Sequence, residues 1–159
     1  MDDHAAVIDE VASIAVSEGA DLVLHSGDLF DRPVPPVDAL SLGLGGLVRL
    51  ADAGRRPVVV VAGNHDSPEL FETLAPFLAP FGVHLVGRIR PAAEGGVITL
   101  PTAAGTAHVA CLPFLRAAQV VDFMGGTDGW YGTYAGRLQQ VTESYAAARL
   151  PCTSIARTM

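Results

Sequence analysis

Two short apolar runs, each followed by glycine and then polar residues, constrain this chain more than any other feature. The first run is Leu22–Ser26, which leads into Gly27-Asp28. The second is Pro57–Ala62, which leads into Gly63–Asp66. Both runs are apolar at successive positions, which is typical of parallel strands covered on both faces. The sequence therefore predicts two buried strands that deliver polar side chains to one edge of a sheet.

The segment between the two runs has the length and composition of a connecting helix. About 35 residues separate Asp28 from Asn64, the usual length of one β-α-β unit. Residues 32–36 include three prolines and form a stiff connection. A helix is predicted from Val37 to about Ala53. Its expected core face is Val37, Leu40, Leu44, Leu47, Val48 and Ala51. The glycines at 43, 45 and 46 indicate close helix packing, because a phosphate-binding loop would follow a strand.

Helices and strands are also predicted on both sides of this unit. Residues 2–18 form a helix with a core-facing stripe of Ile8, Val11, Ala12 and Ala15. Ser67 is expected to cap a helix that has Pro68 at its first position and a break near Pro76. Strands are expected at 83–86, 97–100 and 108–112, and a helix at 134–150. This order predicts an α/β fold, a layered sandwich with a mixed sheet.

The composition narrows the classes of function. Half of the 159 residues are hydrophobic, enough for one well-packed domain. The net charge of −7 argues against a nucleic-acid-binding surface made of basic side chains. An enzyme with this charge can still bind phosphates through bound cations. Cys111 and Cys152 show neither metal-ligand spacing nor a disulfide framework, which fits a reducing cytoplasm. We find no signal peptide and no run of residues suited to a membrane.

The residues that follow the two strands have the chemistry of a metal site. In an open α/β sheet, ligands bind beyond the carboxyl ends of the strands. A carboxylate such as Asp28 can bridge two divalent ions, and the carbonyl oxygen of Asn64 is a neutral ligand acceptable to Mn or Mg. His65 is placed to protonate a leaving group or to stabilise charge on a phosphoryl oxygen.

Two further carboxylates have more than one interpretation. Asp66 orients His65 or caps the next helix. Asp31 orients the site or caps the turn before the prolines, and we favour the turn cap. The alternative for the whole set is a pair of ordinary turns, since Gly, Asp and Asn are common turn residues. Because both loops end buried strands and stand one β-α-β unit apart, we favour the metal site.

These loops resemble the second and third motifs of the calcineurin-like metallophosphoesterases. The residues that carry the resemblance are Gly27–Arg32 and Gly63–Ser67. Leu29-Phe30-Asp31 followed by Pro35, together with Leu112–Leu115, is similar to the SbcD-type nuclease subunits within that superfamily. The resemblance runs from about residue 5 to about residue 155.

The resemblance implies a function and a set of roles. It implies that Asp28 bridges two metals, that Asn64 binds the second metal and that His65 is the catalytic histidine. It also implies two divalent ions, with Mn preferred, that activate water for phosphodiester hydrolysis. The implied substrate is a DNA end, and the implied partners are an SbcC-type ATPase and a second copy in a homodimer.

The chain departs from that family in its metal ligands. The family has an early strand ending in Asp-x-His, a later lone His and a Gly-His-x-His. Here no strand precedes the first helix, and Thr153–Ala156 resembles the start of the strand for the lone His. We expect His4 to be solvated, and His25, His84 and His108 to be core or edge residues rather than ligands. Catalytic metals need about three protein ligands each, so metal binding should be weak.

We therefore expect residues 1–159 to be a partial metallophosphoesterase domain, truncated at both ends. The leading functional hypothesis is a subunit of a DNA double-strand-break-processing nuclease, impaired in this fragment. One alternative is another metallophosphoesterase, either a phosphatase or a cyclic-nucleotide phosphodiesterase. Another is a non-catalytic remnant that binds a partner.

Overall fold

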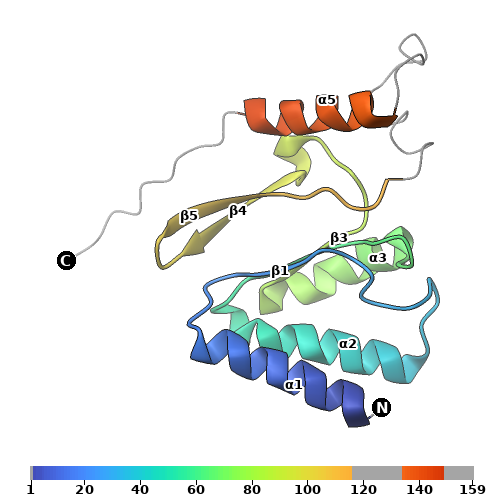
Figure 1. Cartoon of the computed structure of the whole chain (residues 1–159), viewed down its shortest axis with the longest axis vertical. Helices are drawn as coiled ribbons and strands as arrows, with labels where there is room; N and C mark the ends of the chain where they lie inside the picture. Colours follow the sequence, from blue (N-terminus) through green and yellow to red (C-terminus); the bar gives the residue numbers. More distant parts are fainter. Residues whose placement is uncertain (1, 116–133, 149–159) are drawn as a thin grey trace. The chain divides into compact units, whose positions relative to one another are not determined.

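The computed structural model describes residues 2–115 and 134–148 (Figure 1). The chain divides into two compact units, residues 1–88 and residues 89–159. Each unit has its own sheet. Cys152 and the expected strand at 153–156 lie outside the described residues.

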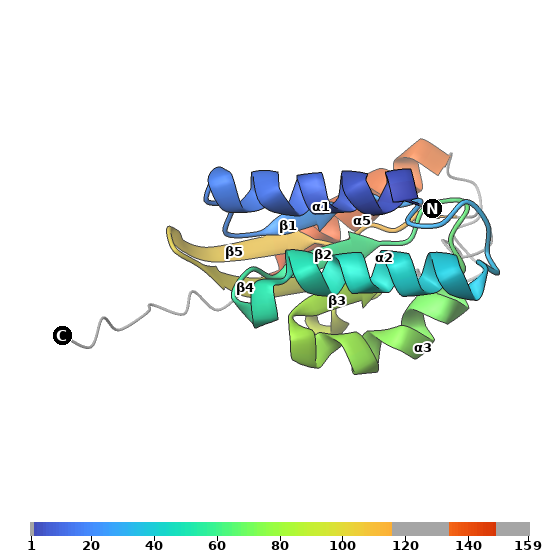
Figure 2. The same cartoon turned by 90° about the horizontal axis from the view of Figure 1, so that it is seen from below.

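The first unit is a three-stranded parallel sheet in the order β1-β2-β3. Its strands are β1 (Val23–His25), β2 (Val58–Val61) and β3 (Val83–Val86). Its helices are α1 (Asp2–Ser17), α2 (Val37–Leu50) and α3 (Pro68–Leu78), with short 3₁₀ turns at Asp52–Gly54 and Ala79–Phe81. Figure 2 shows the three helices side by side across one face of this sheet. The predicted β-α-β unit is confirmed, and a second one follows it directly.

The core of this unit lies between the sheet and its helices. Val58 and Val60 of β2 and Val83 and Leu85 of β3 point toward the helices and are buried. The helices contribute apolar residues that pack with them: Ala15, Leu47, Leu50, Phe71 and Leu78. At about 25 cal/mol per Å² of buried apolar surface, this layer supplies the main driving force for folding the unit.

Glycines in α2 allow close packing, as the sequence predicts. A Cβ on Gly43 would come within 2.9 Å of the Phe30 ring, and a Cβ on Gly46 within 2.8 Å of the Ile8 side chain. Both distances are too short for a real contact. Gly43 and Gly46 therefore allow close packing, whereas a Cβ on Gly45 would meet only the Arg49 side chain at an ordinary distance of 3.6 Å.

Three expectations about burial are wrong. Val11 is 45% exposed, because α1 lies at one end of the row of three helices and meets α2 through Ile8. Val37 is 79% exposed, because it is the first residue of α2. Leu24 is 62% exposed, because it lies on the edge strand and points away from the helices. Of the two strands predicted to be buried on both faces, only β2 is so.

The start of α3 is confirmed, while the break expected in it is absent. Ser67 is the N-cap, its Oγ accepts the amide of Leu70 at 3.2 Å, and Pro68 is the first helical residue. The helix continues through Pro76 to Leu78.

The second unit is an antiparallel hairpin with a helix. Its elements are β4 (Val97–Thr102), β5 (Gly105–Ala110), α5 (Tyr134–Ala147) and a 3₁₀ turn at Ala92–Glu94. The predicted hairpin is confirmed, and its turn is residues 103–104, just before Gly105. The Tyr145 hydroxyl donates to the carbonyl oxygen of Arg90 at 2.7 Å and so ties α5 to the segment before the hairpin.

None of the helices within residues 2–115 and 134–148 has both the length and the apolar character needed to cross a bilayer.

A buried arginine joins the ends of α1 and α2. Arg56 is only 8% exposed. Its Nε donates to the carbonyl oxygen of Ala20 at 2.9 Å and its Nη1 to that of Leu50 at 3.0 Å. These carbonyls stand at or just beyond the C-terminal ends of the two helices, where a cation is favourable. Arg55 is the neighbouring residue, but it forms only an exposed ion pair with Asp52.

We expect Arg56→Met to lower the free energy of unfolding by about 2–3 kcal/mol, because two buried carbonyls lose a charged donor. Arg55→Met is the matched control and should leave stability nearly unchanged, since exposed ion pairs contribute little. Urea denaturation followed by circular dichroism measures both. Equal losses in the two variants would contradict the role assigned to Arg56.

Candidate metal centre at the carboxyl edge of the parallel sheet

The loops after β1 and β2 touch at two glycines. We call residues 27–32 the first loop and residues 63–67 the second loop. A Cβ on Gly27 would lie 2.7 Å from the Cα of Gly63, and a Cβ on Gly63 would overlap the carboxylate and amide of Asp28. No larger residue fits at either position. The backbones can therefore approach closely enough for the side chains of both loops to share one site.

Asp28 has an unusual backbone conformation. Its φ is 57° and follows a φ of 114° at Gly27. Non-glycine residues rarely adopt positive φ, and such strain persists only where the surroundings fix the conformation. The Asp28 carboxylate is exposed, and its Oδ1 accepts the amide of His65 at 3.0 Å. Among the described residues its Oδ2 has no hydrogen-bond partner, so one oxygen remains for a ligand.

Asn64 and His65 stand on the exposed side of the second loop. The Nδ1 of His65 lies 3.0 Å from the backbone oxygen of Asp31. A carbonyl oxygen can only accept, so Nδ1 carries the proton and Nε2 is left for another partner. The loops thus bring Asp28, Asn64 and His65 together as the sequence predicts.

Asp31 contributes through its backbone and not through its carboxylate. The carboxylate forms an ion pair with Arg32, whose Nη2 lies 2.7 Å from Oδ2. The Nε of Arg32 also donates to both carboxylate oxygens. The hydrogen bond from Arg32 holds the pKa of Asp31 below its usual value. The carboxylate is therefore paired rather than capping the turn, while the carbonyl oxygen orients His65.

Asp66 is buried beneath the two loops and is 1% exposed. Its Oδ1 accepts the amide of Phe30 at 3.0 Å. Its Oδ2 accepts the amides of Leu29 at 3.2 Å and Gly63 at 2.8 Å. Ser67, and not Asp66, is the N-cap of α3. Sequence reasoning missed this link between the loops, because the link depends on how the two strands pair.

Three of the other histidines lie inside strands. The Nδ1 of His25 in β1 accepts a hydrogen bond from the amide of Gly27 at 3.3 Å. This contact helps to fix the backbone at the start of the first loop. His84 of β3 is half-buried, and burial lowers its pKa. The Nδ1 of His108 in β5 lies 3.0 Å from the hydroxyl of Thr99.

Burial raises the pKa of the Cys111 thiol to about 11, so this cysteine stays protonated at neutral pH.

An Asp-x-His spacing does occur in the sequence, at Asp2-Asp3-His4. It lies in the first turn of α1 and not at the end of a strand. Asp3 and His4, with Val7 and Ile8, line a hollow of about 270 Å³. Two possible ligands beside two aliphatic side chains do not form a metal site.

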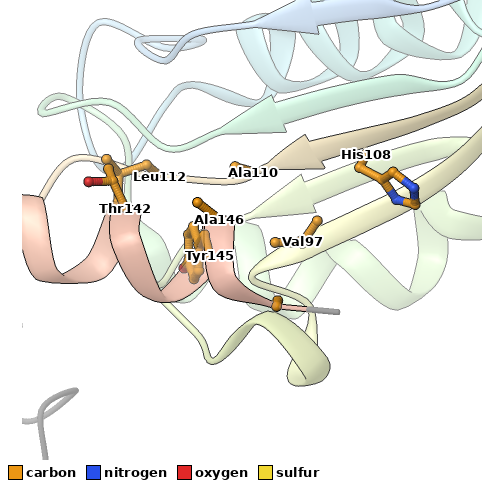
Figure 3. A pocket seen from close by; sticks show the side chains of 8 residues that line it. Val97, His108, Ala110, Leu112, Thr142, Tyr145 and Ala146 are labelled. Carbon is orange, nitrogen blue, oxygen red and sulfur yellow. The ribbon is translucent and has the colours of Figure 1, made fainter. Parts of the chain in front are cut away.

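The second unit contains a larger hollow of about 460 Å³ between the hairpin and α5 (Figure 3). Its lining is mostly apolar and includes Val97, Ala110, Leu112 and Ala146. Figure 3 shows His108 apart from Tyr145 and Thr142 of α5. The lining lacks the carboxylates, and the pairing of a base with a nucleophile, that hydrolytic chemistry needs.

The donor set at the touching loops fits part of a divalent-metal site. A free carboxylate oxygen and an amide carbonyl are the oxygen ligands that Mn and Mg accept. Within the part of the chain that the structure describes, no three His, Cys, Asp or Glu residues gather as a metal cluster. Asp28 and Asn64 therefore supply some of the ligands of such a centre and not a full set.

Comparison with known proteins assigns the chain to a family. Residues 1–140 match the family model described as calcineurin-like phosphoesterase. The SbcD subunit of the nuclease SbcCD from Bacillus subtilis is 34% identical over 127 residues, covering 80% of this chain and 32% of that protein. The corresponding SbcD subunit from Rhodobacter capsulatus is 31% identical over 148 residues, covering 86% of this chain and 36% of its own length.

A further relative matches a shorter stretch. "DNA double-strand break repair protein Mre11" of Sulfurisphaera tokodaii is 42% identical over 67 residues, which is 42% of this chain and 17% of that protein. This chain spans about a third of the length of the two SbcD subunits. The family model nevertheless matches most of this chain, which therefore belongs to the calcineurin-like phosphoesterase family.

Proposed function

We propose that this chain is the central part of the nuclease domain of an SbcD-type subunit, which hydrolyses phosphodiester bonds at DNA ends with two divalent ions, Mn preferred. The observation that carries the proposal is the juxtaposition of Asp28, Asn64 and His65 on the exposed side of two touching loops. The relatives named as SbcCD subunits and Mre11 support a nuclease over other phosphoesterases.

Each residue has a defined role in this proposal. Asp28 offers its free oxygen as the bridging ligand, and Asn64 offers its carbonyl oxygen to the second ion. The bound ions supply Lewis-acid activation of water and neutralise charge on the phosphate. His65 is held through Nδ1 by the backbone of Asp31, so its Nε2 faces the substrate. In its protonated form it stabilises a phosphoryl oxygen or donates to the leaving group.

The remaining features of the proposal concern the intact protein. We propose that other parts of a longer polypeptide complete the domain with the Asp-x-His strand and the later histidines. The name of the relatives describes a subunit of a complex, and we extend this to an SbcC-type ATPase partner and a homodimer in the cytoplasm. Residues 1–159 alone should then bind metal weakly, because their ligand set is incomplete.

For the 159-residue chain alone, we expect little or no Mn-dependent cleavage of linear duplex DNA. The physical reason is that Asp28 and Asn64 do not provide about three ligands per ion. Release of nucleotides from an end-labelled duplex, with and without Mn, measures this. Robust cleavage by the chain that Asp28→Ala abolishes would contradict the view that residues 1–159 hold an incomplete set of metal ligands.

For a longer polypeptide that adds the ligand strands of a bacterial relative, we expect cleavage of DNA ends in preference to a phosphomonoester. Asp28→Ala should reduce that activity by about 100-fold or more, because a bridging ligand is lost. Asp38→Ala, an exposed residue in the first turn of α2, is the control and should keep it. Preference for the monoester would indicate a phosphatase and would contradict the proposed nuclease function.

A further inference from the structure

Asp66 is the only carboxylate among the described residues that is fully buried. Its two oxygens accept three backbone amides, those of Leu29, Phe30 and Gly63. A carboxylate is well suited to this task, because it accepts several hydrogen bonds and donates none. Asp66 is therefore a connector and is not available as a ligand or as a partner of the His65 ring.

The connection runs in both directions. Asp66 of the second loop accepts amides from the first loop, and Asp28 of the first loop accepts the amide of His65 from the second. We call this reciprocal pair of carboxylates the loop clasp. The Asp28 contact lies on the exposed side of the loops, whereas the Asp66 contacts lie on the buried side. The two contacts fix the backbone of both loops on either side of Asn64, at Gly63 and at His65.

The loops need such a clasp because strand pairing ends before them. The ladder between β1 and β2 ends at His25 and Val60. Beyond it, Asp28 must keep a positive φ that an aspartate does not favour. Two of the amides that donate to Asp66 belong to Leu29 and Phe30, which follow Asp28 directly. These hydrogen bonds fix the backbone just after the strained residue. The hydrogen bond from the Gly63 amide to Asp66 fixes the backbone just before Asn64 in the same way.

We infer that Asp66 is a positioning residue, which sets the spacing of Asp28 and Asn64 and thereby the metal affinity of the site. This inference rests on the proposed metal centre. It assigns to Asp66 neither contact with the metal nor contact with substrate. Loss of Asp66 should weaken metal binding even where the domain remains folded.

The test compares Mn²⁺ binding by the complete 159-residue chain and two variants. Asp66→Asn keeps the shape of the side chain but places an amide donor against amide donors. Val58→Ala is the matched control, because Val58 is fully buried at the start of β2, at the opposite end of the strand from the second loop. Binding is read from paramagnetic broadening of the backbone amide signals of the two loops, which detects weak sites, and folding from urea denaturation.

We expect broadening in the wild-type chain to centre on Asp28 and Asn64. Asp66→Asn should need at least about tenfold more Mn²⁺ for the same broadening, the usual cost of losing a residue that orients ligands. Val58→Ala should lower stability and leave the Mn²⁺ dependence unchanged. Amides of Leu29 and Phe30 should exchange with solvent faster in Asp66→Asn only.

Other outcomes overturn the inference in distinguishable ways. Equal Mn²⁺ dependence in wild type and Asp66→Asn overturns the positioning role and leaves the metal centre in place. Equal shifts in Asp66→Asn and Val58→Ala show that stability alone is responsible. Absence of broadening in the wild type overturns the metal centre and the positioning role together. If Asp66→Asn does not fold, Asp66→Glu is measured, and failure of both to fold makes Asp66 a residue of the fold only.

Discussion

The contact between two loop backbones is the constraint on which the proposed site depends. Gly27 and Gly63 meet at a distance that no side chain permits. The hydrogen bonds between the loops depend on that approach, because it lets Asp28 accept the amide of His65 and lets Asp66 accept the amide of Phe30. A parallel sheet provides the approach readily, since its strands end at the same edge. The helices on one face supply the burial that holds the strands at that spacing.

The proximity of the two loops that carry Asp28, Asn64 and His65 could be predicted from the sequence, while the support beneath them could not. Polar residues directly after apolar runs identify the ends of buried strands, so Asp28, Asn64 and His65 could be placed near one another. The role of Asp66 could not be deduced, because a carboxylate beside His65 has several partners within reach until the strand register is known. The exposure of Leu24 could not be deduced for a different reason, which is the position of β1 at the edge of the sheet. An apolar sequence does not distinguish an edge strand from a central one.

The charges near the loops bear on how an acidic chain would act on DNA. Arg32 of the first loop is paired with Asp31, and Arg88 after β3 is paired with Glu69. These pairs are half-exposed or more, and they leave little net positive charge at this edge. In a chain of net charge −7, attraction for phosphate must then come largely from bound cations. The proposed nuclease activity and the proposed metal requirement are thus physically linked.

The loop clasp also bears on the order of folding and metal binding. Many small metal sites form only when the ion binds, because their ligands have no other reason to converge. Here the two loops are joined by hydrogen bonds among protein groups, and the buried carboxylate of Asp66 has all its partners within the chain. The proposed ligands therefore converge without an ion. In the proposed centre an ion would not have to order the two loops, so the conformational entropy of these loops would not be subtracted from its binding free energy.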